Sequence, residues 1–186
     1  MSVPGDSSSL SLPAEEPADP EPPEQLTLAI VEEDGDWSGF NLLEEAIRQA
    51  ATALARHRRL QLAQGIEASI VLGSDALVRR LNRAYRGKDA PTNVLSFPYQ
   101  KPPGAALDAG AYMGDVVLAA ETVWQEAAER GIEPRHHLQH LVVHGLLHLL
   151  GYDHQTDAAA EEMEGLEAEV LATIGVSDPY AAPAAS

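Results

Sequence analysis

The segment HGLLHLLGYDH, residues 144–154, places three of the chain's seven histidines in one short stretch. Residues four apart share a face of an α-helix, so His144 and His148 are predicted to project side by side, one turn apart. Gly151 can adopt the positive φ that ends a helix, and the chain can then fold back to bring His154 to the same point. The four leucines of this segment are expected to seat the helix in the core. The pattern therefore predicts a buried helix that carries a histidine cluster.

Three neutral imidazoles leave a divalent ion with its full charge and an open coordination position. Zinc is the natural choice for nitrogen ligands in a chain without cysteine. Water in such a site has a pKa of roughly 7, which indicates hydrolysis. The spacing matches that of metzincin proteases, except that Gly145 stands where those enzymes carry a glutamate as general base. The sequence thus predicts a zincin-like metal site that acts on another substrate.

The rest of the chain mixes strands with helices. Alternating or continuous apolar residues predict strands at 25–33, 65–73, 93–99 and 112–120. Apolar stripes, caps and glycine stops predict helices at 39–59, 75–85, 121–130, 134–150 and 157–174. This order predicts a single layered domain of the α/β or α+β class.

The ends of the chain differ in composition from this domain. Residues 1–24 are rich in Pro, Ser and acidic residues, so we expect a disordered tail, followed by a domain at 25–180 and a flexible C-terminus at 181–186. There is no secretory signal and no apolar stretch of membrane-spanning length, so we expect a cytoplasmic protein.

The formal net charge of −17 argues against a protein that simply coats nucleic acid. Residues 48–88 depart from this charge because they hold nine basic and two acidic residues. They form either solvated helix faces or a strip that faces phosphates. The sequence alone leaves these two interpretations open.

Five separated motifs stand out along the chain: HGLLHLLGYDH (144–154), YRGKDAPTNVLSFPY (85–99), MGDVVL (113–118), EEMEGLEAEVLATIG (161–175) and DPY (178–180). Together, over roughly residues 26–180, they resemble the YbeY family of rRNA maturation factors. The resemblance implies an α+β domain with a mixed four-stranded sheet and about five helices. It also implies a zinc-dependent, single-strand-specific endoribonuclease that matures the 3′ end of 16S rRNA and takes part in ribosome quality control. The implied zinc ligands are His144, His148 and His154, with one zinc ion per chain.

The resemblance also makes Arg86 the functionally important arginine. A guanidinium can hold a phosphate in a bidentate manner, which supports a catalytic role, although a structural salt bridge to Asp115 is the alternative. Asp115 and Asp153 are the carboxylates available as general base, but we favour a role for both in orienting a ligand histidine. His140, one turn before His144, is expected to support that ligand or to face substrate. Water and an RNA 2′-OH both remain possible nucleophiles.

We expect single-stranded rRNA, the ribosome and assembly proteins as partners, and neither DNA nor a membrane. A zinc peptidase or another metal-dependent hydrolase is the first alternative, and the missing glutamate at position 145 weakens the peptidase. A non-catalytic ribosome assembly factor that uses zinc only to brace its fold is the second. An open fourth coordination position weakens it, because structural zinc sites are closed.

Overall fold

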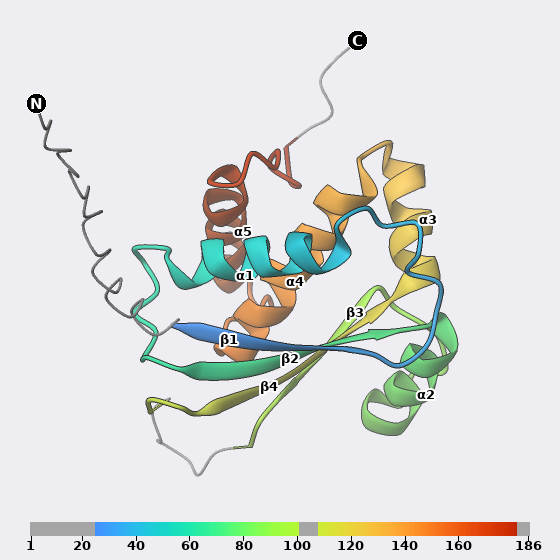
Figure 1. Cartoon of the computed structure of the whole chain (residues 1–186), viewed down its shortest axis with the longest axis horizontal. Helices are drawn as coiled ribbons and strands as arrows, with labels where there is room; N and C mark the ends of the chain where they lie inside the picture. The colour runs from blue at the N-terminus through green and yellow to red at the C-terminus, as the bar shows by residue number, and fades with distance from the viewer. Residues whose placement is uncertain (1–24, 101–107, 182–186) are drawn as a thin grey trace, which may run out of the picture.

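The computed structural model describes residues 25–100 and 108–181 as four strands and five helices (Figure 1). The strands are β1 (Leu26–Glu32), β2 (Ile66–Gly73), β3 (Val94–Pro98) and β4 (Tyr112–Ala119). The helices are α1 (Leu43–Ala55), α2 (Asp75–Arg86), α3 (Ala120–Arg130), α4 (Pro134–Leu149) and α5 (Asp157–Ala172). The predicted tail at 1–24 and almost all of the predicted C-terminal segment lie outside the described residues.

The four strands form one mixed sheet in the order β1-β2-β4-β3. β2 pairs in parallel with β1 and β4, whereas β3 pairs antiparallel with β4 and forms an edge. Pro98 is the last paired residue of β3, opposite Gly114. A proline fits this place because an edge strand can do without one backbone N–H. The predicted α+β class, mixed four-stranded sheet and five helices are confirmed.

Helices cover the sheet unequally on its two faces. Figure 1 shows α1, α4 and α5 on one face and α2 on the other. Successive residues of a strand point to opposite faces, so Val116 of β4 joins the large core beneath α1, α4 and α5. Its neighbour Val117 joins a smaller cluster with Val78 of α2. This division separates residues that are close in sequence.

The first helix is shorter than predicted. We expected it to span residues 39–59, whereas α1 spans Leu43–Ala55. Leu42 has a φ of 53°, which a helix interior does not allow, so α1 begins only at the next residue. The segment before it packs instead, and the Phe40 and Trp124 rings lie 4.3 Å apart between centroids. Aromatic packing against α3 therefore replaces the first turn of the predicted helix.

Among the described helices, none combines the length and the apolar composition required to cross a membrane.

Candidate metal centre

Helix α4 contacts the sheet closely at Gly145, where the absence of a side chain permits the approach. A Cβ atom at this position would lie 2.5 Å from Cγ1 of Val116 and 3.3 Å from Oγ of Ser96. The Ser96 hydroxyl also donates a hydrogen bond to the Gly145 carbonyl, at 3.1 Å. The residue after the first histidine therefore faces the sheet. No side chain fits there, which explains the absence of the metzincin glutamate.

The structure brings His144, His148 and His154 together at the end of α4. Each offers one ring nitrogen, and these three atoms lie within 4.8 Å of one another. Gly151 has a φ of 97°, as predicted for the turn that returns the chain toward α4. The His154 ring centroid lies 5.8 Å from that of His144 and 5.1 Å from that of His148. The arrangement can hold a metal ion.

The Nδ1 atoms of the two cluster histidines on α4 already have hydrogen-bond partners. Nδ1 of His144 lies 2.8 Å from Oε1 of Glu167, and Nδ1 of His148 lies 2.9 Å from the Tyr152 carbonyl oxygen. A carboxylate and a carbonyl only accept, so both Nδ1 atoms must donate. In the neutral rings, each Nε2 then presents its lone pair to the cluster.

This geometry suits zinc. The two Nε2 atoms of His144 and His148 are 3.1 Å apart. Two nitrogens bound at 2.0–2.1 Å to a tetrahedral zinc ion lie about 3.3 Å apart. Burial lowers the pKa of His148, and the neighbouring His144 lowers it further. Both effects favour the neutral imidazole that a metal requires.

Glu167 is the central residue of this site that sequence reasoning missed. It is fully buried on α5, and its Oε2 lies 2.8 Å from Nε2 of His140 and also accepts a hydrogen bond from the Tyr180 hydroxyl. Burial raises its pKa, but the hydrogen bonds from His140 and His144 outweigh this effect and bring the pKa down to about 2. Glu167 is thus an ionised carboxylate that holds two histidine rings.

A signal for Glu167 was present in the sequence. Met163, Leu166 and Val170 are buried at helical spacing on α5, and position 167 falls within the same stripe. An acidic residue at a core position needs a buried partner, because an unpaired buried charge is costly. The histidines of α4 are that partner.

The other predicted residues of the site lie in different surroundings. His140 directs its Nε2 to Glu167 and not to the three-histidine cluster. Asp115 accepts a hydrogen bond from the Tyr112 hydroxyl at 2.7 Å, and Asp153 accepts one from the backbone N–H of Gln155 at 3.1 Å. Neither aspartate has a hydrogen bond to a histidine among the described residues. The carboxylate that contacts a cluster histidine is Glu167. The expected role of the two aspartates in orienting a ligand histidine stays a prediction.

Arg86 is the last residue of α2 and is exposed, across the sheet from α4 (Figure 1). Within the described part of the chain it has no ion pair, so the salt bridge to Asp115 considered above is absent there. The alternative of a simple structural role for this arginine loses its proposed partner.

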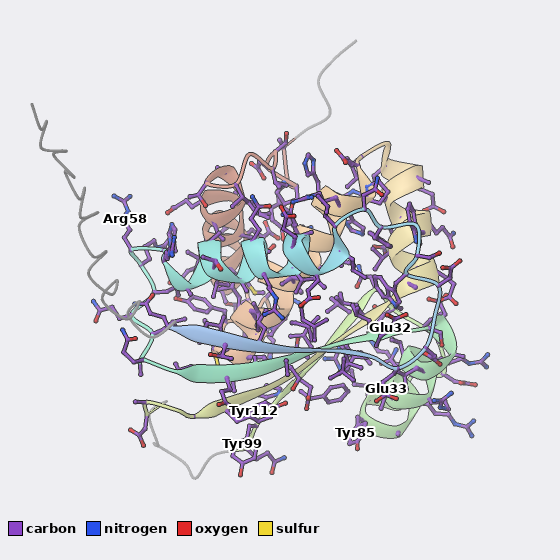
Figure 2. All side chains as sticks on the ribbon, in the orientation of Figure 1. Glu32, Glu33, Arg58, Tyr85, Tyr99 and Tyr112 are labelled. Carbon is purple, nitrogen blue, oxygen red and sulfur yellow. The ribbon has the colours of Figure 1, made fainter. Side chains whose placement is uncertain are left out.

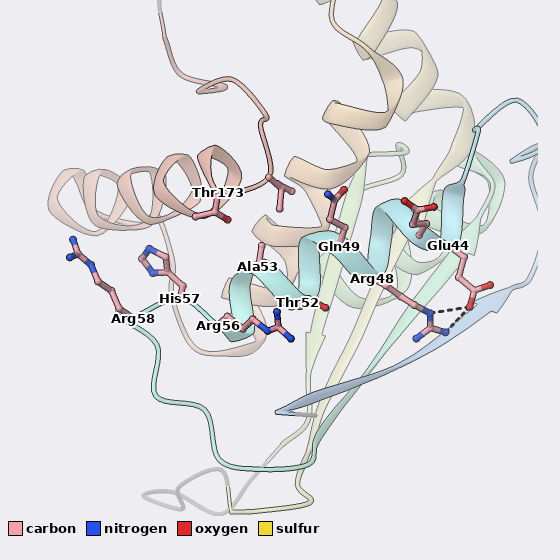
Figure 3. A pocket seen from close by; sticks show the side chains of 11 residues that line it. Glu44, Arg48, Gln49, Thr52, Ala53, Arg56, His57, Arg58 and Thr173 are labelled. Atoms are coloured by element: carbon pink, nitrogen blue, oxygen red, sulfur yellow. Dashed lines mark hydrogen bonds and ion pairs between the residues drawn. The ribbon is translucent and has the colours of Figure 1, made fainter. Parts of the chain in front are cut away.

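The basic stretch at 48–88 does not form one continuous strip. Its first part lies on and just after α1, where Arg48, Arg56 and Arg58 line an open cavity of about 1000 Å³ (Figure 3). There the Arg48 guanidinium pairs with Glu44 at 2.6 Å. The remaining basic residues lie on and after α2, across the sheet. The two groups therefore face different surroundings.

Known proteins are similar to this chain in sequence and in fold. The sequence model of the family Endoribonuclease YbeY matches residues 33–175. An endoribonuclease YbeY of Azorhizobium caulinodans is 49% identical over 83% of this chain and 96% of the relative. One of Parvibaculum lavamentivorans is 45% identical over 84% and 86%. The solution structure of TM1509 from Thermotoga maritima has a TM-score of 0.51 and 25% identity, and the match covers 84% of this chain and all of that one.

Proposed function

Because the chain belongs to the YbeY endoribonuclease family, we propose that it is a zinc-dependent endoribonuclease that cleaves single-stranded RNA. The observation that carries this proposal is the cluster of His144, His148 and His154, with two Nδ1 atoms engaged and two Nε2 atoms 3.1 Å apart. When bound, zinc supplies a Lewis acid for a phosphodiester oxygen and activates a nucleophile. Both lower the barrier to phosphodiester cleavage.

The chain's own residues prepare this centre. Glu167 and the Tyr152 carbonyl fix the orientation and the tautomer of His144 and His148. We assign to Arg86 the binding of an RNA phosphate, because its guanidinium is exposed and is a bidentate phosphate ligand. His140, tied to Glu167, supports the metal site from one turn away.

We further propose that the substrate is ribosomal RNA and that the reaction matures the 3′ end of 16S rRNA. The ribosome and its assembly proteins are the proposed partners, in ribosome quality control in the cytoplasm. A partner that presents the strand suits a chain with a net charge of −17, because free RNA is repelled by most of such a surface. DNA and membranes are not among the proposed partners.

The test uses the purified full-length chain. We expect about one zinc ion per chain by elemental analysis, and zinc-dependent cleavage of a single-stranded RNA but not of its duplex. His144→Ala should lose both metal and cleavage. Casein should remain intact in the same buffer, since position 145 cannot carry the glutamate of a peptidase. Proteolysis of casein without RNA cleavage would refute the proposal.

Arg86 is tested by charge reversal. Arg86→Glu should retain zinc but lose RNA cleavage, whereas Arg58→Glu, the same change at an exposed arginine near α1, should retain both. Cleavage by Arg86→Glu at the wild-type rate would refute the phosphate-binding role of Arg86 while leaving the zinc centre intact.

A further inference from the structure

Two exposed tyrosines lie on the side of the sheet opposite α1 and α4. Tyr85 at the end of α2 is 71% exposed, and Tyr99 just after β3 is 60% exposed. Figure 2 shows both, with Tyr112, on the side of the sheet that faces away from α1. Exposed aromatic rings offer a flat face on which a nucleic-acid base can stack.

Each of these rings rests on a second aromatic ring of the sheet. The centroid of Tyr85 lies 5.2 Å from that of Phe97, at an interplanar angle of 66°. The centroid of Tyr99 lies 6.1 Å from that of Tyr112, at 70°. These edge-on contacts restrict each exposed ring while its other surface remains open to solvent. The rings are thus prepared to stack on a flat partner.

Unpaired positive charge follows Tyr85 directly in the chain. Arg86 and Lys88, at and just beyond the end of α2, are exposed and have no ion pair among the described residues. Two of the acids nearby are occupied, since Asp89 pairs with Arg79 at 2.8 Å and Asp115 accepts from Tyr112. Glu67, opposite Tyr112 on β2, is exposed. Unpaired cations beside open aromatic rings fit a chain of phosphates and bases.

We propose that Tyr85, Tyr99, Arg86 and Lys88 form a stacking surface for single-stranded RNA, on the side of the sheet opposite the metal centre. The tyrosines stack on bases and the cations bind the phosphates between them. The inference rests on the proposed function, because it takes RNA as the substrate. It adds a second region that binds the RNA, outside the three-histidine site. A duplex, whose bases are already stacked, is a poor ligand for this surface.

Binding is measured apart from cleavage, on the full chain treated with a zinc chelator. The probe is a short fluorescein-labelled oligouridylate, followed by anisotropy at low salt. Tyr85→Ala should weaken binding about tenfold, the usual loss for one stacked base, whereas Tyr85→Phe should bind as wild type. Arg86→Glu should also weaken binding, and Arg58→Glu, the same charge change near α1, should not.

A second probe reports stacking itself. An RNA that carries 2-aminopurine should lose fluorescence on binding the wild-type chain and recover it with Tyr85→Ala. Equal affinity of Tyr85→Ala and wild type, or equal losses from Arg86→Glu and Arg58→Glu, would overturn the stacking surface. Binding of polyglutamate through Tyr85, without binding of RNA, would also overturn it and indicate an acidic protein partner.

The two proposals fail differently. A zinc-loaded chain that binds the oligouridylate through Tyr85 but never cleaves RNA refutes the nuclease and not the stacking surface. A chain that cleaves RNA while Tyr85→Ala binds normally refutes the stacking surface and not the nuclease.

Discussion

Oε1 of Glu167 lies 2.8 Å from Nδ1 of His144, which links α5 to the first histidine of the cluster. The carboxylate has no solvent exposure, and its other oxygen is occupied by His140 and Tyr180. The ring of His144 is therefore fixed before any metal binds, with its Nε2 directed at His148. A ligand set in advance loses less conformational freedom on binding.

We expect Glu167→Gln to weaken zinc binding about 10- to 100-fold, the usual effect of losing a carboxylate behind a ligand histidine. The amide keeps the size of the side chain but loses the charge that holds both imidazoles. A competition titration against a fluorescent zinc chelator measures the affinity.

Glu161→Gln is the matched control, because Glu161 lies on the same helix and is exposed. It should bind zinc as wild type. Equal affinity of wild type and Glu167→Gln would show that the hydrogen bond to His144 does not influence the metal.

The histidine cluster was predictable because its members lie in one segment whose spacing fixes their faces. Glu167 was harder, because it meets His144 only after α5 packs on α4, and such packing is not written in local periodicity. Asp115 lies on a strand that was correctly predicted. Periodicity alone does not say which face of that strand α4 covers. In the structure, Asp115 accepts a hydrogen bond from Tyr112.

Zinc should stabilise the folded chain, since the three ligands converge only after folding. At a free zinc concentration a hundredfold above the dissociation constant, the gain is about 2.7 kcal/mol. This corresponds to a rise in the midpoint of thermal unfolding of roughly 5–10 °C for a chain of this size. Thermal unfolding with zinc and with a chelator measures the difference.

His154→Ala removes one ligand from the turn and should lose most of this rise. His136→Ala changes a half-exposed histidine at the start of α4 and should retain it. A full zinc-induced rise in His154→Ala would exclude His154 from the metal site.

Gly145→Ala tests the close approach of α4 to the sheet. The new Cβ would lie 2.5 Å from Cγ1 of Val116 and 3.0 Å from its Cγ2, and a buried valine has no room to turn away. Overpacking of this kind costs about 1–3 kcal/mol, and the better helix propensity of alanine offsets about 1 kcal/mol. We expect a net loss of up to about 2 kcal/mol in the free energy of urea unfolding.

The double variant gives the control for this packing. In a Val116→Ala background the clash is gone, so Gly145→Ala should be neutral or stabilising there. The same cost in both backgrounds would mean that the Gly145 contact with Val116 does not set the distance of α4 from the sheet.

His137 gives the folded chain a dependence on pH away from the metal ligands. Its side chain is 2% exposed, and its Nε2 lies 2.7 Å from Oε2 of Glu126 on α3. Burial lowers the pKa of His137, while Glu126 raises it and the nearby His140 and Arg130 lower it, for a net shift below the usual value of 6.5. The unfolded chain therefore binds a proton at a higher pH than the folded chain does.

The contribution of His137 to the free energy of unfolding is fully present above pH 6.5. It declines as the pH falls from 6.5 toward the lowered pKa of the folded state. His137→Gln keeps a hydrogen-bond donor for Glu126 but does not titrate. Without zinc, we expect its free energy of unfolding to change less than that of wild type between pH 7 and pH 5. Urea titrations at both pH values measure this difference. A steeper loss in the variant than in wild type would mean that folding raises the pKa of His137. The folded chain would then hold the His137 proton more tightly than the unfolded one.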